Sequence, residues 1–414
     1  MDVETLFSKA LGIEYPWKIT GINFDSSKKR LEINVDFVRG ATFQHVDVLT
    51  GEVQDYKAYD TKIKTWRHLN FFEHECYLVV RTPRIKPEGG GIQLIMPPWS
   101  GVVAGFTMLF EAFIVQLCIH TPVHQVGKIL KIADRKLWHL LDCYVFKGLL
   151  RADHSEVTAF GVDETSVKKG HDYISLFVDF HQKKTIHISE GKGHQTIADF
   201  AEIFVQHNGI KEAVKDVSCD MSPAFIKGIK ESFPSAQITF DKFHILKLIN
   251  EAVDAVRRAE VKSEWFLRGA RYAILKNECN LSPQQRQTRE NLSKMNLKTM
   301  RAVRIREGFQ EIYKAISYEE FEQRLKEWYF WATHSRLAPI KKIAKTIKKH
   351  WDGILRWKKS QINNGILEGL NSVIQAAKRK ARGYKAGHFK TMAFLLTGKF
   401  DFKTINPFLP THFA

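Results

Sequence analysis

The stretch VKDVSCDMSPAFIKGIKESFPSAQITFD (Val214–Asp241) decides the fold of this chain. It begins with an apolar run that ends at Asp220, continues as an amphipathic segment from Pro223, and closes with a second apolar run. This order predicts a strand, a helix and a strand. A helix is expected just before it, at Thr196–His207. Three earlier runs also predict strands: VTAFGVD (Val157–Asp163), YISLFVDF (Tyr173–Phe180) and KTIHISE (Lys184–Glu190).

Three consecutive strands followed by alternating helix and strand is the element order of a ribonuclease-H-like fold, a mixed sheet flanked by helices. A Rossmann unit is the alternative, but no G-x-G-x-x-G follows any predicted strand. We therefore expect residues 153–243 to form the first part of a ribonuclease-H-like domain. Residues 244–360 have helical apolar spacing and few Gly or Pro, which predicts an all-helical insertion. Residues 361–414 are expected to complete the domain with a helix at Asn363–Lys380 and a C-terminal tail.

The chain changes character twice upstream of this sheet. Residues 1–100 are expected to form a small β-rich module, because Arg30–Val38 and Cys76–Ile85 alternate apolar and polar residues. The Pro/Gly-rich segments Pro87–Gly91 and Pro97–Gly101 mark its end. The class predicted for the whole chain is thus a multidomain α+β protein.

Residues 101–152 turn helical and contain a helix–turn–helix rhythm at Thr121–Val145. The first predicted helix carries an apolar face, and a turn follows near Ile132–Asp134. Such a second helix can lie in a DNA major groove, whereas the alternative is a helical hairpin that serves only as core. The residues concerned are apolar Val123, Val126 and Ile129 in the first helix, inward Leu137, Leu140 and Leu141 in the second, and outward Arg135, Lys136 and His139.

Two aspartates are predicted to close neighbouring strands of the sheet. Asp163 ends the first strand and Asp220 ends the fourth, and in a ribonuclease-H-like sheet these two strands lie side by side. Phosphoryl transfer on DNA needs charge compensation, which two divalent ions about 4 Å apart provide when hard oxygen ligands hold them. An aspartate at a strand end is also a common turn or helix cap, so Asp220 has a structural alternative as the cap of the next helix.

The third carboxylate is expected from a helix that crosses the sheet. In Asn363–Lys380, Glu368 is the only acid, and it shares one face with amides rather than with lysines. A plain surface glutamate is the alternative. The apolar stripe is predicted to consist of Ile366, Leu370, Val373, Ile374 and Ala377, and the face of Glu368 to contain Asn364, Asn371, Gln375 and Arg379.

Two features lie near this predicted centre. Asp241 and His244 follow the fifth strand, where the histidine is either an auxiliary group at the scissile phosphate or a structural histidine. A basic run continues the Glu368 helix and is expected where DNA enters, although a solvated helix C-terminus also favours cations. Its DNA-binding candidates are Lys378, Arg379, Lys380 and Arg382.

Charge supports a polyanionic partner. The 63 Lys and Arg against 45 Asp and Glu give a formal net charge of +18, and clustered cations favour binding to phosphates. The N-terminus lacks the pattern of a signal peptide, and Gly105–His120, the longest apolar stretch, is too short to span a bilayer. We expect a soluble, cytoplasmic protein with no membrane partner. Five cysteines without C-x-x-C spacing argue for a reducing compartment: Cys76, Cys118, Cys143, Cys219 and Cys279.

Several blocks of the sequence together resemble the ISL-three family of bacterial insertion-sequence transposases, in that family's order. They are TWRHLNFFEHECYL (Thr65–Leu78), GVDETSVKKGHDY (Gly161–Tyr173), VSCDMSPAFIKGIKESFPSA (Val217–Ala236), FDKFHILKLINEAVDAVRR (Phe240–Arg258) and NNGILEGLNSVIQAAKRKARGY (Asn363–Tyr384).

The resemblance implies a DDE transposase in which Asp163, Asp220 and Glu368 bind two Mg²⁺ or Mn²⁺ ions. It also implies recognition of terminal inverted repeats by the helix–turn–helix region, cleavage of DNA at the element ends and transfer of the ends to target DNA. We expect a homodimer or higher homo-oligomer on double-stranded DNA, associated with the bacterial nucleoid. The Asp241–His244 spacing is similar to a motif of related transposases with helical insertions.

One departure concerns the family's N-terminal module, which usually binds zinc through cysteines. The corresponding segments here, Gly40–Val48 and Thr82–Gly91, contain no cysteine. We therefore expect no structural zinc. The remaining ligand-type residues have no recognisable spacing: His45, His68, His74 and Cys76.

Two other classes of protein compete with the transposase hypothesis. One is a catalytically silent DNA-binding regulator derived from a transposase, and the intact acids argue against it. The other is a nuclease of the same fold that cuts without strand transfer. A zinc hydrolase is disfavoured because no H-E-x-x-H cluster occurs.

Overall fold

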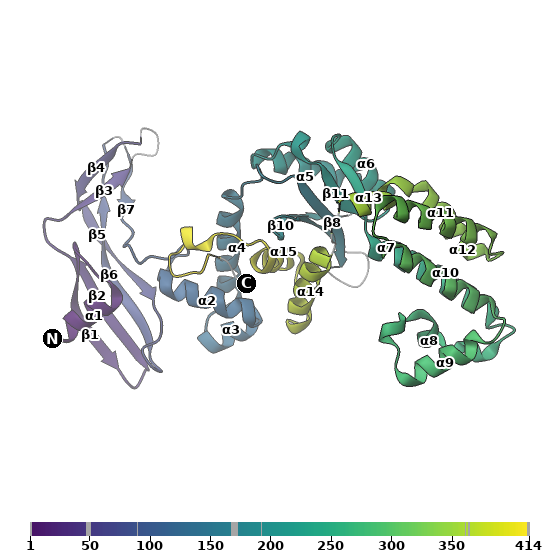
Figure 1. Cartoon of the computed structure of the whole chain (residues 1–414). Helices are drawn as coiled ribbons and strands as arrows, with labels where there is room; N and C mark the ends of the chain where they lie inside the picture. Colours follow the sequence, from purple (N-terminus) through teal and green to yellow (C-terminus); the bar gives the residue numbers. More distant parts are fainter. Residues whose placement is uncertain are drawn as a thin grey trace. The chain divides into compact units, whose positions relative to one another are not determined.

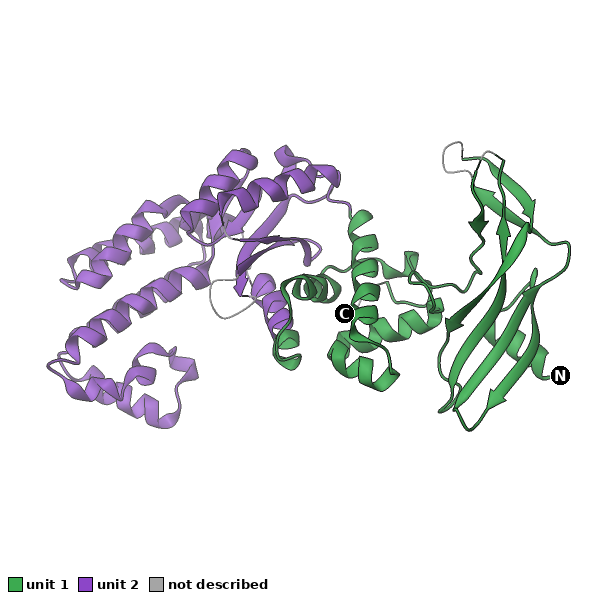
Figure 2. Ribbon diagram, turned by 180° about the vertical axis from the view of Figure 1, so that it is seen from behind, with its two compact units in different colours: residues 1–152, 376–414 green, residues 153–375 purple. Residues whose placement is uncertain are grey.

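The computed structural model describes residues 2–46, 51–88, 90–166, 173–191, 193–360, 362 and 365–411 of the 414-residue chain. The chain divides into two compact units (Figures 1 and 2). Unit 1 consists of Met1–Ala152 and Ala376–Ala414, and unit 2 of Asp153–Gln375. None of the helices in the described part of the chain combines the length and apolar character that crossing a bilayer requires.

Unit 2 is built on a five-stranded mixed sheet. Its spatial order is β10-β9-β8-β11-β12, with β8, β9 and β10 antiparallel to one another and β8, β11 and β12 parallel. The five predicted strand positions and the pairing of the first strand with the fourth are confirmed. The strands are β8 (Ala159–Ser166), β9 (Tyr173–Asp179), β10 (Lys184–Glu190), β11 (Asp216–Cys219) and β12 (Gln237–Phe240).

The core of this sheet is rich in phenylalanine. α5 (His194–Gln206) and α6 (Pro223–Ser232) pack against each other, and Phe200 of α5 stacks on Phe177 of β9 with ring centroids 4.1 Å apart. At the other edge, α13 (Trp351–Ser360) packs on β12. A Cβ at Gly353 would lie 2.4 Å from the ring of Phe240, so only glycine permits this approach.

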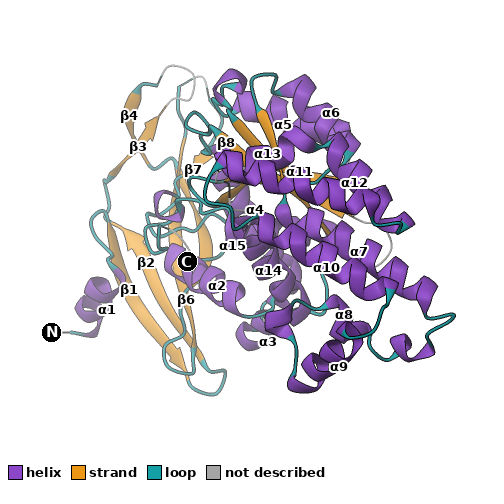
Figure 3. Cartoon of the chain, turned by 45° about the vertical axis from the view of Figure 1, so that its right-hand side comes forward, coloured by secondary structure: helices purple, strands orange, loops and turns teal. Residues whose placement is uncertain are grey.

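Residues Lys242–Ser360 form only helices and connecting loops, as the sequence predicts (Figure 3). The long α7 packs against α10 and α12, and Phe309, Phe321 and Trp328 are buried between helices. The helices are α7 (Lys242–Glu260), α8 (Arg271–Leu275), α9 (Pro283–Ser293), α10 (Lys298–Ile312), α11 (Tyr318–His334) and α12 (Ala338–Lys349), with 3₁₀ turns at Trp265–Arg268 and Glu278–Asn280; another 3₁₀ turn, Lys211–Ala213, precedes β11.

α14 (Gly365–Lys380) is the predicted last helix of the sheet domain, and its sequence crosses the division between the two units at Gln375 and Ala376. The predicted start of this helix, Asn363 and Asn364, lies outside the described residues.

Unit 1 begins with a helix and a β-rich module that is more extensive than the two predicted strands. Its main sheet has the order β1-β2-β6-β5, with β7 on β6, and β3 and β4 form a separate hairpin. β5 was missed because most of its side chains are exposed or half-exposed, so apolar alternation is weak. The elements are α1 (Val3–Leu11), β1 (Trp17–Asp25), β2 (Arg30–Phe37), β3 (Thr42–Val46), β4 (Val53–Lys57), β5 (Asp60–Arg67), β6 (Glu75–Ile85) and β7 (Gln93–Leu94).

Unit 1 continues with α2 (Met108–His120), α3 (Val123–Leu130) and α4 (Asp134–Leu150), as the helical pattern predicts. Buried Glu111 of α2 accepts hydrogen bonds from Tyr144 Oη at 2.9 Å and from the backbone N of Val102 and Val103, each at 2.7 Å. Burial is the main cause that raises the pKa of this carboxyl group. The network fixes the Pro/Gly-rich segment against the helices.

The C-terminal tail packs in unit 1 rather than on the sheet. α15 (Ala386–Thr397) lies against α4, and the 3₁₀ turn Phe402–Thr404 follows. Asn406 is buried and donates to Tyr144 Oη at 2.7 Å and to Met108 O at 2.8 Å. The expectation that residues 361–414 belong together therefore differs from the contacts, because the apolar side chains of α15 are buried against α4.

Candidate functional site

The first aspartate lies where two strands part. The ladder between β8 and β11 ends at Gly161 and Ser218, whereas β8 continues to Ser166 in pairing with β9. Asp163 therefore does not close its strand, and this detail of the sequence prediction was wrong. It lies two residues beyond the parallel ladder, and Asp220 follows the last residue of β11. Both aspartates are thus at the same end of the β8–β11 pair.

Three acids and one histidine gather at this point. His244 Nε2 lies 4.0 Å from Asp163 Oδ1, and His244 Nδ1 lies 3.0 Å from Asp241 Oδ2. Burial is the largest cause that raises the pKa of Asp163, and the charges of Asp241 and Asp220 raise it further. The hydrogen bond to Asp241 is the largest cause that raises the pKa of His244.

Local turns hold two of these acids. Asp241 is the N-cap of α7, where its Oδ1 accepts from Phe243 N at 2.8 Å, so its other oxygen remains for His244. Asp220 Oδ1 accepts from Ser222 N at 2.9 Å, just before α6. Ser222, and not Asp220, is the N-cap of α6, so the alternative of a helix cap is not met; Asp220 closes the preceding turn with one of its two carboxylate oxygens.

α14 contacts β8 through amide side chains. Asn371 Nδ2 donates to Asp163 Oδ2 at 2.6 Å, and Gln375 Nε2 donates to Thr165 Oγ1 at 2.8 Å. A Cβ at Gly161 would lie 2.5 Å from Leu367 Cδ1, so glycine in β8 allows the helix to approach. The amides were recognised as one face in the sequence, but their contact with Asp163 was not.

Glu368 is not brought into contact with the aspartates. It lies one turn before Asn371, is exposed, and makes no hydrogen bond or ion pair among the described residues. In the same described part of the chain, no group of three or more His, Cys, Asp or Glu stands close enough to hold a metal ion. The structure thus gathers Asp163, Asp220, Asp241 and His244, and leaves Glu368 apart.

The apolar stripe predicted for α14 needs correction. Leu367 and Ile374 are its buried residues, whereas Val373 is 46% exposed. Leu367 was missed because it lies between Ile366 and Glu368, outside the stripe that the spacing suggested.

The segment predicted as a helix–turn–helix forms α3 and α4. Leu137, Leu140 and Leu141 of the second helix are fully buried, as predicted. Ile129 does not belong to the apolar face of the first helix, because it is 66% exposed. A Cβ at Gly127 would lie 2.6 Å from Asp134 Oδ1, so this glycine allows the tight turn between the helices.

The basic residues predicted to lie on the outer face of α4 differ in their exposure to solvent. Arg135 and His139 are exposed. Lys136, however, is half-buried, with Nζ 3.8 Å from the centroid of the Phe106 ring, and burial is the main cause that lowers its pKa. Lys136 was therefore wrongly predicted to point outward, because the segment before α2 supplies a ring that covers it.

The basic run after Glu368 belongs to unit 1 from Ala376 onward. Arg379, Lys380 and Arg382 are exposed, and Lys380 Nζ donates to the carbonyl oxygen of His120. Lys378 is half-buried, with Nζ 5.7 Å from the Phe389 ring centroid. Just beyond the run, His388 stacks on Trp138 of α4 with centroids 3.9 Å apart. The run and the helix–turn–helix therefore lie in one unit.

The residues considered as remnants of a zinc module are dispersed over the β-rich module. His45 lies in the β3–β4 hairpin, and Cys76 is buried in β6. The backbone N of His68 donates to the carbonyl oxygen of Cys76 at 2.8 Å, and burial lowers the pKa of the His68 ring to about 4.

Comparison with known proteins supplies independent information. A family model described as a transposase, DDE_Tnp_ISL3, matches residues 160–393, a range that includes Asp163, Asp220 and Glu368. The transposase for insertion sequence element IS1001 of Bordetella parapertussis is 26% identical over 343 residues, which cover 80% of this chain and 83% of the relative. The transposase for insertion sequence element IS1557 of Mycobacterium tuberculosis is 24% identical over 353 residues, covering 78% and 79%.

Proposed function

Because the chain belongs to the ISL-three family of insertion-sequence transposases, we propose that it cleaves DNA at the ends of its element and transfers those ends to target DNA. The observation that carries the proposal is the cluster of Asp163, Asp220, Asp241 and His244 at one end of the β8–β11 pair. Acids gathered at the ends of neighbouring strands are suited to phosphoryl transfer.

The strand order of unit 2 supports a ribonuclease-H-like catalytic domain. Three antiparallel strands are followed by two parallel strands, and helices α7–α13 are inserted before the helix that carries Glu368. We assign Asp163, Asp220 and Glu368 as the catalytic trio, with Asp241 and His244 as auxiliary residues. We include Glu368 in the catalytic trio because it lies one turn before Asn371, which donates a hydrogen bond to Asp163.

The donor atoms fit hard divalent cations. Carboxylate oxygens are the ligands that Mg²⁺ and Mn²⁺ prefer, and the mutual charge of the acids favours a bound cation. Asn371 Oδ1 is buried beside Asp163 without a hydrogen-bond partner among the described residues. Two such ions held by Asp163, Asp220 and Glu368 would supply a water of lowered pKa and charge compensation at the scissile phosphate.

The chain's own residues would orient these ligands. Asn371 binds Oδ2 of Asp163 and so fixes the rotamer of this carboxylate, while Gln375 fixes the helix on β8. Asp241 binds Nδ1 of His244, which leaves Nε2 directed toward the acid cluster, where it can donate to a phosphate oxygen. No covalent protein–DNA intermediate is required, because water and the freed 3′-OH serve as nucleophiles in turn.

DNA ends would be recognised by unit 1. Arg135 and His139 on α4, together with exposed Arg379, Lys380 and Arg382, form our candidate surface for the terminal inverted repeats. Two ends must be held together during transposition, so we propose a homodimer or larger assembly on DNA.

The test is cleavage and strand transfer on duplexes that carry the element's own ends, in Mg²⁺. Asp163→Asn and Glu368→Gln should each lower the cleavage rate at least about 10³-fold, because each removes a metal ligand. Glu212→Gln, an exposed acid outside the site, is the matched control and should cleave normally. Full cleavage by either site variant would refute the assignment. Cleavage without strand transfer would identify a nuclease, and sequence-specific binding without cleavage would identify a regulator.

A further inference from the structure

The helical insertion contains an open groove of about 380 Å³ between α7, α8 and α10. One wall is a face of α7, where Phe243, Lys247, Asn250, Asp254 and Arg258 recur at three- and four-residue spacing. This part of the helix spans about 22 Å. Because Phe243 directly precedes His244, the groove begins next to the candidate active site and leads away from it.

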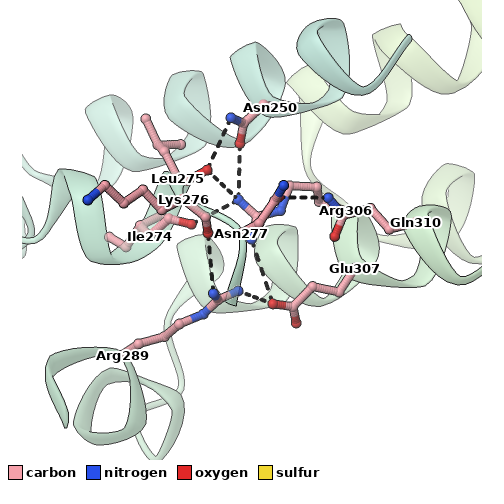
Figure 4. Close-up of polar contacts among 9 residues, drawn as sticks. All are labelled: Asn250, Ile274, Leu275, Lys276, Asn277, Arg289, Arg306, Glu307 and Gln310. Atoms are coloured by element: carbon pink, nitrogen blue, oxygen red, sulfur yellow. Dashed lines mark hydrogen bonds and ion pairs between the residues drawn. The ribbon is translucent and has the colours of Figure 1, made fainter. Parts of the chain in front are cut away.

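The buried lining of the groove includes Arg306 of α10, which is 2% exposed. Figure 4 shows its Nη1 beside three acceptors: Asn250 Oδ1 at 3.0 Å, Ile274 O at 2.9 Å and Leu275 O at 3.1 Å. Its Nε and Nη2 have no hydrogen-bond acceptor among the described residues. This guanidinium is thus buried with three of its five N–H donors without an acceptor among the described residues.

The charge of Arg306 is only partly compensated. The nearest carboxylate is Glu307, with Oε1 3.6 Å from Arg306 Nη2, but the same oxygen accepts a hydrogen bond from Arg289 (Figure 4). Burial lowers the pKa of Arg306 to about 10, so it remains protonated at neutral pH. Two arginines therefore share one carboxylate, and a buried cation that lacks full compensation is costly unless an anion approaches it.

The rim of the groove carries further cations. Lys247 and Arg271 are exposed and make no hydrogen bond or ion pair among the described residues. The acid Asp254 is already paired, with Arg257 at 2.7 Å and Arg258 at 3.3 Å. Of the other lining acids, only Glu251 remains to offset Lys247, Arg271 and Arg306. The groove is therefore net positive along its length.

We propose that this groove binds the sugar-phosphate backbone of a DNA strand next to the candidate active site. One phosphate lies over the Arg306 side of the groove, and its neighbours pair with Lys247 and Arg271. The length favours a polymer over a free anion, since about 22 Å corresponds to roughly six nucleotides at 3.4 Å of rise each. The identity of the anion as element DNA rests on the proposed function.

Binding of a fluorescent element-end duplex in EDTA tests the groove without catalysis. Lys247→Ala combined with Arg271→Ala should weaken binding about tenfold, and the slope of log K against log salt should fall by about 2. The matched control removes the same charge from exposed positions on α12, with Lys341→Ala and Lys345→Ala, and should bind like the wild type. Equal affinity of both double variants would overturn the proposal. Binding of millimolar inorganic phosphate to the groove without any change in the affinity for DNA would also overturn it, because that result would identify a small-anion site.

A cross-linking experiment locates the strand independently. Asn277→Cys, on the groove wall, should form a disulfide by exchange with a mixed disulfide tethered to the DNA backbone, which releases a small thiol, in a Cys279→Ser background that removes the exposed cysteine. Gln323→Cys, exposed on α11 and not part of the groove, should not. Absence of the Asn277→Cys cross-link would overturn the proposal even if cleavage depends on Asp163. Conversely, a cross-link in a chain that never cleaves DNA would overturn only the proposed function.

Discussion

The N-terminus and the middle of α7 lie beside two centres of opposite unbalanced charge. At its N-terminus, Asp241 caps the helix beside Asp163 and Asp220, and His244 is the nearest basic group. Two turns further along, Asn250 binds Arg306, which shares Glu307 with Arg289. The first centre lacks positive charge and the second lacks negative charge. Divalent cations and a DNA phosphate would supply what each centre lacks.

The two centres also differ in how they are held. The acids are held by a turn, a helix cap and the amide of Asn371, through hydrogen bonds to the same carboxylate oxygens that would bind a cation. Arg306 instead ties α10 to α7 and α8 through three acceptors, and is fully enclosed. We therefore expect changes at the arginine centre to alter the free energy of unfolding, and changes at the acid centre to alter the chemistry.

Arg306→Met should produce the largest loss of stability. It removes the donor to Asn250 Oδ1 and to the carbonyl oxygen of Ile274, and unsatisfied buried acceptors cost about 1–3 kcal/mol each. We expect the free energy of unfolding in urea to fall by about 3 kcal/mol. Arg304→Met, an exposed neighbour on α10, should change it by less than about 0.5 kcal/mol. Similar values for both variants would mean that the buried network does not hold the insertion together.

Burial has the opposite outcome at His154, which stays neutral, from that at Arg306, which keeps its charge. His154 is 2% exposed and stacks on Phe204, and burial is the largest cause that lowers its pKa to about 4. The fold favours the neutral ring, so its contribution to stability is present above the unfolded value of about 6.5 and is lost as the pH falls toward 4.

The wild type should therefore lose about 2 kcal/mol of stability through His154 between about pH 7.5 and 5. In His154→Phe, an apolar replacement for the stacked ring, that part of the pH dependence should disappear. Urea denaturation at both pH values measures the difference between the two proteins. An unchanged pH dependence in the variant would show that folding does not lower the pKa of His154.

Asn371→Ala should have the smallest effect, and only on chemistry. It removes the donor to Asp163 Oδ2 and so frees the rotamer of a ligand. We expect the cleavage rate to fall about tenfold at saturating Mg²⁺, since loss of positioning lowers the rate without removing a ligand. Ser372→Ala, on an exposed position of the same helix, should cleave like the wild type. A loss as large as that of Asp163→Asn would instead make Asn371 a catalytic residue.

Sequence reasoning succeeded where local pattern is strong. The strands of the mixed sheet, the all-helical insertion and the buried leucines of α4 follow from apolar periodicity alone. It failed where a partner distant in sequence decides the outcome. Lys136 turns onto Phe106, and Ile129 stays exposed, because neighbouring elements determine which side of a helix is covered. The position of Asp163 beyond the parallel ladder depends likewise on where β11 ends.

In the candidate site, too, local pattern selected the residues, whereas contacts between distant elements could not be predicted. The acids Asp163 and Asp220 could be selected from strand order, and Glu368 from its amide-rich helix face and the family resemblance. The donor from Asn371 and the pairing of His244 with both Asp241 and Asp163 required coordinates. No spacing rule relates residues 163 and 371, because the intervening helices carry no information on the register between α14 and β8.

What the sequence determined by itself is the family and the order of elements, and it selected the candidate acids, because all of these follow from local periodicity and motif spacing. What only the tertiary structure decided is the placement of charge. Arg306 and Arg289 look like ordinary surface cations of amphipathic helices in the sequence, and packing alone buries them around one carboxylate. Burial and compensation of a charge depend on every neighbouring element, so they become visible only when the chain is folded.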